Sequence, residues 1–284
     1  MSMVTLIVRC SLPVLLLFAS DTSDAGDLPD EYRCDFRDGA FDNDTLAPLS
    51  PGTSRLMHPG NTGLEMRLPA GRMLPAVCIS PVFRVRGDFE ITASFDIRNQ
   101  RSPQEGYGCG PTIYLATHSQ TEISAMLGRL SRPGKKQVYS TSISTTVDSK
   151  RQQQVRLMDA SGQRGKLRLV RVGAELRFQV ADGDAGTFRQ LRETEFTADD
   201  IQLVRFAAQQ SDAATPVDVV WHDIVIRAEE LLDRPETLAA GERRHRPTYA
   251  PASKPERLPL WWSLASGLAL VLLVSAVVWY RRTR

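Results

Sequence analysis

Short runs of alternating apolar and polar residues recur along the middle of the chain. The clearest spans residues 87–97, "GDFEITASFDI", in which every second residue from Phe89 to Ile97 is apolar. Such alternation places apolar residues on one face of a β-strand and polar residues on the other. We therefore predict a strand over 89–97. Its polar face carries Glu90, Thr92, Ser94 and Asp96.

Similar runs predict further strands, separated by turn-forming residues. Segments 166–172 and 174–180 flank Gly173, an arrangement that favours a tight β-hairpin. We predict additional strands in four segments, 63–68, 112–117, 202–208 and 217–226. A chain dense in short strands, without a long run of helical period, is typical of an all-β domain.

These strands belong to one predicted domain, residues 26–232. A single sheet cannot bury both of its faces, so the strands require a second layer. We predict an antiparallel two-sheet jelly-roll sandwich.

The two ends of the chain depart from this pattern. Residues 1–25 are typical of a secretory signal peptide, with Arg9 before an apolar stretch and small residues near the expected cleavage site. An uncleaved N-terminal anchor is the alternative. Residues 260–280 carry no charge and are long enough to cross about 30 Å of hydrocarbon. They predict a transmembrane helix, with a buried core helix as the alternative.

The order of these segments predicts a single-pass type I protein of the cell membrane. Basic residues flank 260–280 on both sides, so charge alone does not set its orientation. A leading signal peptide does, because it starts translocation and leaves residues 26–232 outside the cytoplasm. Residues 233–259 are rich in proline and charge and predict an extended stalk. Residues 281–284 form a cytoplasmic tail, and the lipid bilayer is a predicted partner of 260–280.

The cysteines and the net charge give little information about the function of the protein. Removal of the signal peptide leaves Cys34, Cys78 and Cys109, an odd number in a compartment that permits disulfides. We predict a bridge between Cys34 and Cys78, and three buried free thiols are the alternative. The formal charge of +2 identifies no partner, and we predict no nucleic-acid binding.

Candidate catalytic and metal-binding residues are sparse. Glu90 and Asp96 lie six residues apart on one strand face, about 20 Å at strand rise. Glycoside hydrolysis requires two carboxyl groups about 5–5.5 Å or about 6.5–9.5 Å apart. The chain also lacks the His-Glu-x-x-His and Cys-x-x-Cys patterns of zinc sites. We predict no catalytic residues, and a non-enzyme is favoured over an enzyme.

Two short motifs have a functional and a structural interpretation. Asp182 and Asp184 in "ADGDAGTF" supply hard oxygen ligands of the kind Ca²⁺ prefers, although the same residues suit a hairpin turn. No other cofactor is predicted. The Arg-Gly-Asp triplet at 86–88 is interpreted as a turn leading into the following strand rather than as an adhesion motif.

Four segments resemble the successive core blocks of a domain family known mainly from planctomycete bacteria. They are "GLEMRLPAG" (63–71), "GDFEITASFDI" (87–97), "GKLRLVRVGAEL" (165–176) and "VVWHDIVIRAEEL" (219–231). That family is similar in strand pattern to the concanavalin A-like lectin and glucanase sandwiches, and the resemblance implies this fold over residues 30–232. It implies no catalytic residue. Glucanases of that superfamily carry Glu-x-Asp-x-x-Glu on one strand, whereas this chain contains no Glu-x-Asp.

The fold analogy predicts a binding module that presents one face to carbohydrate or another component of the cell envelope. Lectin-like sandwiches bind sugars through aromatic rings and polar side chains. The predicted ligand-binding residues are therefore Glu90, Thr92, Ser94, Asp96, Tyr107, Tyr114 and Tyr139. Two alternatives stay open: a glycoside hydrolase or lyase with an unrecognised site, and a purely structural or adhesive module.

Overall fold

The structure is a computed structural model that describes residues 28–39, 41–49, 52–117, 123–147 and 150–235. The predicted signal peptide, transmembrane helix and cytoplasmic tail, and nearly all of the predicted stalk, lie outside these ranges. No helix within the described ranges is long and apolar enough to cross a membrane.

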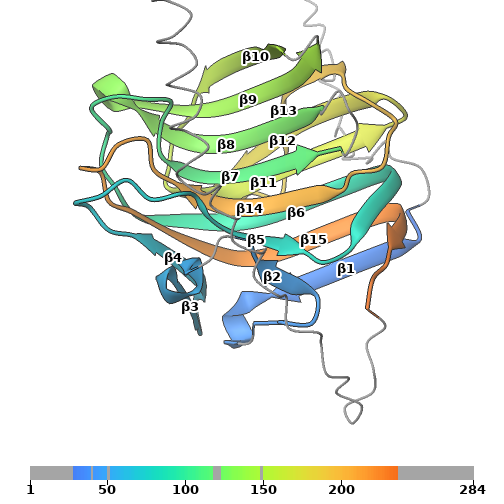
Figure 1. Ribbon diagram of the computed structural model, residues 1–284, viewed down its shortest axis with the longest axis horizontal. Helices are drawn as coiled ribbons and strands as arrows, with labels where there is room; N and C mark the ends of the chain where they lie inside the picture. Colours follow the sequence, from blue (N-terminus) through green and yellow to red (C-terminus); the bar gives the residue numbers. More distant parts are fainter. Residues whose placement is uncertain (1–27, 40, 50–51, 118–122, 148–149, 236–284) are drawn as a thin grey trace, which may run out of the picture. The chain divides into compact units, whose positions relative to one another are not determined.

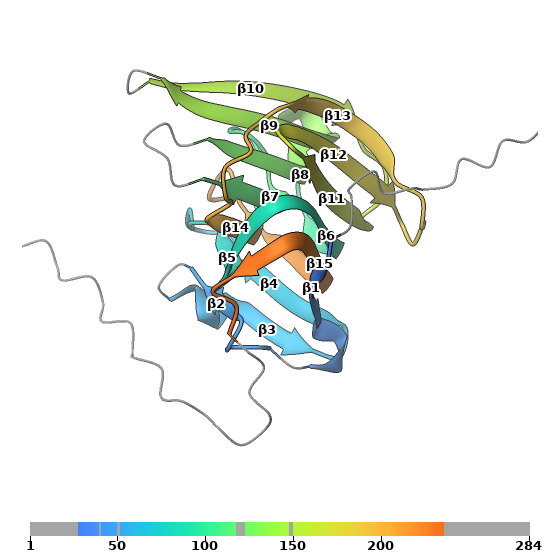
Figure 2. The ribbon, with the colours of Figure 1, turned by 90° about the vertical axis from the view of Figure 1, so that its right-hand side faces the viewer.

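The described chain folds into two antiparallel β-sheets that pack as two layers (Figures 1 and 2). The first is an eight-stranded sheet. Its path runs through β13 (Arg189–Glu195), β12 (Glu175–Asp182), β11 (Arg164–Val172), β6 (Arg84–Gln100), β15 (Val217–Leu232), β4 (Gly63–Leu68) and β3 (Met57–Gly60), with β1 (Asp30–Asp35) also paired to β15.

The second layer is a seven-stranded sheet. Its order is β10 (Lys150–Asp159), β9 (Lys136–Val147), β8 (Ser124–Arg132), β7 (Gly110–Ala116), β14 (Leu203–Gln209), β5 (Val77–Pro81) and β2 (Leu46–Pro48). Three short 3₁₀ helices connect strands: η1 (Phe36–Asp38), η2 (Thr53–Leu56) and η3 (Pro133–Lys135). Sequence alternation thus predicted the all-β, two-sheet architecture correctly.

The core lies between the sheets, where the apolar faces of the strands meet. Phe89, Ile91 and Ala93 of β6 are fully buried there. Trp221 of β15 packs edge-on against Phe95 of its own sheet at 6.3 Å and against Phe206 of the opposite sheet at 6.0 Å, between ring centroids. Trp221 therefore joins the two layers.

The predicted hairpin around Gly173 is confirmed. Val172 of β11 pairs with Glu175 of β12, and Gly173 takes a left-handed conformation with φ of 58°. Such a conformation costs glycine least, because it has no Cβ.

The Arg-Gly-Asp triplet lies inside β6, so our interpretation of it as a turn was wrong. Gly87 has φ of 70° where the pairing register between β6 and β15 shifts, the geometry of a β-bulge. A Cβ at this position would clash with the carboxylate of Glu229. The Asp88 carboxylate accepts a hydrogen bond from the backbone N–H of Gly173 at 2.6 Å. The triplet is thus part of the sheet.

The predicted Cys34–Cys78 disulfide is not formed, and both residues are buried. Cys34 belongs to β1 of the eight-stranded sheet and contributes to the core. Cys78 belongs to β5 of the other sheet, between the core residues Val77 and Ile79, so strand alternation turns it away from the core. The two side chains therefore point in directions that a disulfide cannot join.

Candidate functional site

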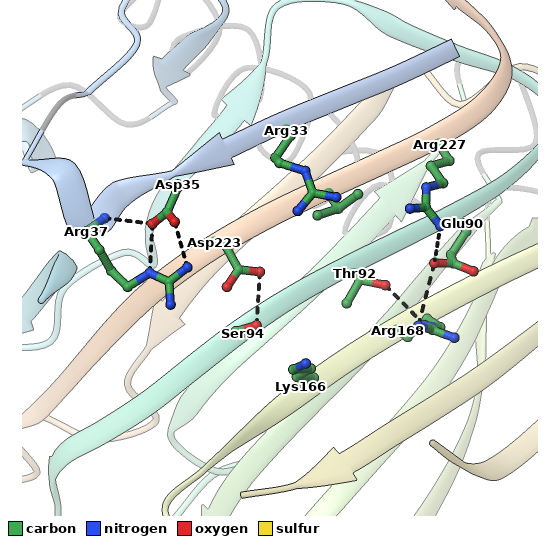
Figure 3. Close-up of a pocket in the computed structure, with 11 residues that line it drawn as sticks. Arg33, Asp35, Arg37, Glu90, Thr92, Ser94, Lys166, Arg168, Asp223 and Arg227 are labelled. Atoms are coloured by element: carbon green, nitrogen blue, oxygen red, sulfur yellow. Dashed lines mark hydrogen bonds and ion pairs between the residues drawn. The ribbon is translucent and has the colours of Figure 1, made fainter. Parts of the chain in front are cut away.

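The polar face of β6 forms the floor of a groove on the outer side of the eight-stranded sheet (Figure 3). Two adjoining hollows make up this groove, with volumes of about 260 Å³ and about 560 Å³. Arg37, Ser94, Lys166 and Asp223 line both hollows, so we treat them as one site and name it the β6 groove.

The pairing register of the sheet decides which side chains meet in the β6 groove. One row across the strands runs Lys166, Ser94, Asp223 and Asp35, from β11 through β6 and β15 to β1. The adjacent row on the same face runs Arg168, Thr92, Val225 and Arg33. Directly opposed residues on antiparallel strands have Cβ atoms about 4.5–5.5 Å apart, so each row is a set of side-chain neighbours.

Glu90 lies at one end of the groove and is only 4% exposed. Its Oε1 atom lies 3.6 Å from Nη2 of Arg168 and 3.8 Å from Nη1 of Arg227. Arg168 in turn donates from Nε to the Thr92 hydroxyl at 3.2 Å and stacks over the Phe188 ring at 3.5 Å. A buried carboxylate needs such charged partners, because its desolvation is costly.

Asp96 occupies the other end and is 7% exposed. Its Oδ2 atom lies 3.3 Å from Nη2 of Arg98 and 3.9 Å from Nη2 of Arg164. The carboxylates of Glu90 and Asp96 are therefore each flanked by two arginines.

The wall formed by β1 and β15 holds the remaining carboxylates of the first hollow. Asp35 accepts from Nη2 of Arg37 at 2.6 Å and from its Nε at 2.8 Å. This charged hydrogen bond lowers the pKa of Asp35 to about 2, so Asp35 is ionised at neutral pH. Asp223 accepts a hydrogen bond from the Ser94 hydroxyl at 3.0 Å.

The groove brings together all four polar residues predicted on β6. Glu90, Thr92 and Ser94 line the first hollow, and Ser94 and Asp96 line the second. These side chains are nearly buried instead of forming an open polar face. Arg168 of β11 and Arg227 of β15 reach over β6 to these residues, as Figure 3 shows for their contacts with Thr92 and Glu90.

The three predicted tyrosines lie elsewhere. Tyr114 belongs to β7 and Tyr139 to β9 of the seven-stranded sheet, and Tyr107 lies in the segment before β7. Tyr139 is 0% exposed and its hydroxyl donates to Asp182 at 2.6 Å, so its ring offers no face to a ligand. A role for Tyr107 and Tyr114 in sugar binding stays a prediction.

The two aspartates predicted as calcium ligands each contact an arginine. Asp182 lies 3.6 Å from Nη2 of Arg189, and Asp184 lies 3.4 Å from Nη1 of Arg164. Within the part of the chain that the structure describes, no three His, Cys, Asp or Glu side chains are grouped to hold a metal ion. The calcium prediction thus continues to rest on the sequence pattern.

Sequence reasoning missed the partners that complete the groove. Lys166 and Arg168 lie in a strand that was predicted, but their cross-strand neighbours depend on register. The sequence did contain one signal for them. Arg164, Lys166 and Arg168 alternate with Leu167 and Leu169, so the three basic residues lie on one face of β11.

The fold resembles that of solved carbohydrate-active proteins at low sequence identity. An apo Crh5 transglycosylase matches with a TM-score of 0.50 and 12% identity over 72% of this chain and 87% of its own. A glycoside hydrolase family protein from Mycobacterium thermorestibile matches with a TM-score of 0.50 and 10% identity over 69% of this chain and 99% of its own. At such identities the likeness shows the fold alone.

Sequence comparison identifies the family to which the chain belongs. No curated protein is significantly similar to it. One protein family does match, over residues 17–245, and its description reads "Protein of unknown function (DUF1583) C domain". This match covers most of the chain, including every strand of both sheets. The chain is therefore a member of the DUF1583 C-domain family.

Proposed function

We propose that this protein is a non-catalytic glycan-binding module that holds a carbohydrate of the cell envelope in the β6 groove. The observation that carries the proposal is the row of nearly buried polar side chains on β6, which opens into a hollow lined by hydrogen-bonding groups. A sugar is recognised by such an array, because each hydroxyl both donates and accepts hydrogen bonds. The fold likeness to a transglycosylase and a glycoside hydrolase family protein supports a carbohydrate ligand by analogy only.

The chemistry of the groove favours binding over hydrolysis. Glu90 and Asp96 lie at opposite ends of the polar face, about 20 Å apart at strand rise. Asp35, with its pKa lowered to about 2 by Arg37, has no proton to donate at neutral pH. A hydrolase needs a protonated carboxylic acid near a second carboxylate.

One observation favours a hydrolase as the second candidate. Asp35 and Asp223 are paired directly across β1 and β15, which places their Cβ atoms about 4.5–5.5 Å apart. In that mechanism Asp35 would be the nucleophile and Asp223 the acid. Release of reducing ends from a bound glycan, abolished in Asp223→Asn, would favour this candidate over the binding module.

We further propose that residues 260–280 tether the module to the cell membrane with the sandwich on the extracytoplasmic side. The support is the uncharged, apolar segment and the basic tail that follows it. Fractionation of cells expressing the full chain, with and without residues 260–280, tests the tether. Release of the protein from the membrane fraction only after deletion is the expected result.

Binding is tested by presenting the full chain to an array of envelope polysaccharide fragments. A Thr92→Val, Ser94→Ala double variant removes two hydroxyls from the groove, and Ser142→Ala, Ser144→Ala removes two similarly buried hydroxyls from the opposite sheet. We expect the groove variant to lose binding and the matched control to keep it. Failure of every fragment to bind, or equal loss in both variants, would refute the proposal.

A further inference from the structure

The β6 groove contains more cationic than acidic side chains. The cationic residues that line its two hollows are Arg33, Arg37, Arg98, Arg164, Lys166, Arg168 and Arg227. The acidic residues are Asp35, Glu90, Asp96, Asp184 and Asp223. The excess amounts to two charges, as large as the formal charge of +2 of the whole chain. A concave, partly desolvated site with excess positive charge attracts anions.

The cations form two rows that face each other across the floor. Arg164, Lys166 and Arg168 alternate along β11, about 6.8 Å apart at strand rise. Arg33 and Arg37 lie on the opposite side, in β1 and η1 (Figure 3). Since β6 and β15 separate β11 from β1, the rows lie about 14 Å apart at the level of the backbone. A ligand extended over β6 and β15 can therefore reach both rows.

Lys166 is the member of these rows whose charge is uncompensated. Every arginine in the groove has a carboxylate within ion-pair distance, whereas Lys166 has no ion-pair or side-chain hydrogen-bond partner in the described part of the chain. It is half-buried, borders both hollows and lies beside Ser94 in Figure 3. Partial burial of an unpaired ammonium is unfavourable unless an anion completes the site.

We infer that the groove is selective for an acidic glycan, a saccharide chain that bears carboxylate or sulfate groups, with Lys166 as the principal anion contact. This inference rests on the proposed function and narrows its ligand class. The hydroxyls of Thr92 and Ser94 lie between the two cation rows, where sugar hydroxyls would meet them. The acidic groups of the same ligand would meet Lys166 and the outer arginines. Arginine and lysine recognise carboxylate and sulfate through charge-assisted hydrogen bonds.

The test measures the affinity of the full chain for three oligosaccharides of equal length. They are an oligogalacturonide, a sulfated galactan oligomer and a neutral β-glucan oligomer. We expect either acidic oligomer to bind more tightly than the neutral one and to weaken as salt is raised, because salt screens charge pairing. The tighter of the two acidic oligomers identifies the acidic group.

Two variants connect this selectivity to the groove. Lys166→Gln should weaken acidic binding about tenfold and leave neutral binding unchanged. Lys150→Gln, an exposed lysine on β10 of the other sheet, is the matched control and should change neither. Because Lys166 has no ion-pair or side-chain hydrogen-bond partner among the described residues, its loss should not affect folding, which a thermal melt checks.

The contrary results separate the inference from the proposed function. Equal affinity for the neutral oligomer, with no effect of Lys166→Gln, overturns the acidic-glycan inference and leaves glycan binding intact. Absence of binding to all three oligomers and to the envelope array overturns the proposed function itself. Binding of poly-glutamate as tight as that of the oligogalacturonide overturns selectivity for a saccharide, because charge alone would then suffice.

Discussion

The outer faces of the two sheets differ sharply in chemistry, although both belong to one sandwich. The face of the eight-stranded sheet carries ion-paired carboxylates and arginines around a groove. The seven strands of the other sheet contain a single carboxylate, Asp159 at the end of the edge strand β10. In β9 of the same sheet, Ser140, Ser142 and Ser144 lie on the face opposite to the core residues Tyr139 and Ile143.

Paired charges are thus concentrated on one face of the sandwich. Buried or half-buried charges cost stability unless they are paired, so a dense set of them on one sheet face needs a reason beyond folding. The seven-stranded sheet shows that a layer of the same sandwich can form with a single carboxylate in its strands. The charged face is therefore the better candidate for function.

The largest effect is expected from Trp221→Ala, which removes the ring that joins the two sheets. Truncation of a fully buried aromatic residue should lower the free energy of unfolding by about 3–5 kcal/mol. Both faces should then lose structure in one transition, measured by urea unfolding followed with near-UV circular dichroism. Separate transitions for the two sheets would show that they are independent units.

Gly87→Ala should have the next largest effect and should act on the charged sheet. The bulge requires φ of 70° at this position, and a methyl group would also clash with Glu229. We expect a loss of about 2–3 kcal/mol in urea unfolding. Gly173→Ala is the control, because Gly173 shares the left-handed conformation but has open space around it, and it should cost only about 1 kcal/mol. Equal losses would remove the argument for a crowded bulge.

Glu90→Gln tests whether the charges of the groove are mutually dependent. The substitution keeps the shape of the side chain but leaves Arg168 and Arg227 without their shared carboxylate. We expect a loss of about 2 kcal/mol in unfolding free energy. Ser142→Ala on the opposite face should cost less than about 1 kcal/mol, since no charged group depends on it. A Glu90 variant as stable as the serine variant would contradict the described pairing.

The smallest effect concerns pH. The pKa of Asp35 is lowered to about 2 in the folded protein, against about 3.9 in an unfolded chain. Its ionised form therefore stabilises the fold above about pH 4, and this contribution disappears as the pH falls toward 2. The Asp35–Arg37 pair is largely exposed, so solvent limits the effect to less than about 1 kcal/mol. Asp35→Asn should flatten the thermal-melt profile between pH 4 and pH 2, whereas an unchanged profile would contradict the lowered pKa.

The sequence predicted those parts of the fold in which local alternation is strong. Residues 89–97 lie in β6, and the segment 63–68 matches β4 residue for residue. The strands β1, β2, β3, β5, β8, β9, β10 and β13 were not predicted. In β8 and β10, for example, "SAMLGRLSR" and "KRQQQVRLMD" have few apolar residues at a spacing of two, and pairing with β9 decides their conformation.

The candidate site was predicted only along one strand. The polar face of β6 follows from a period of two, but its neighbours follow from register, which joins residues far apart in the chain. Thr92 and Arg168, for example, lie 76 positions apart and share a hydrogen bond. A single sequence contains no signal for that pairing. The same limit explains the incorrect Cys34–Cys78 bridge, since the sequence does not reveal that the two residues lie in different sheets.

We propose that a glycan binds to the charged face of the eight-stranded sheet. Amide hydrogen exchange of the full chain, measured with and without a bound envelope glycan, tests this location. We expect slower exchange in β6 and β11, over residues 90–96 and 164–168, and no change in β8 or β9. Protection confined to residues 124–144 of the seven-stranded sheet would contradict it.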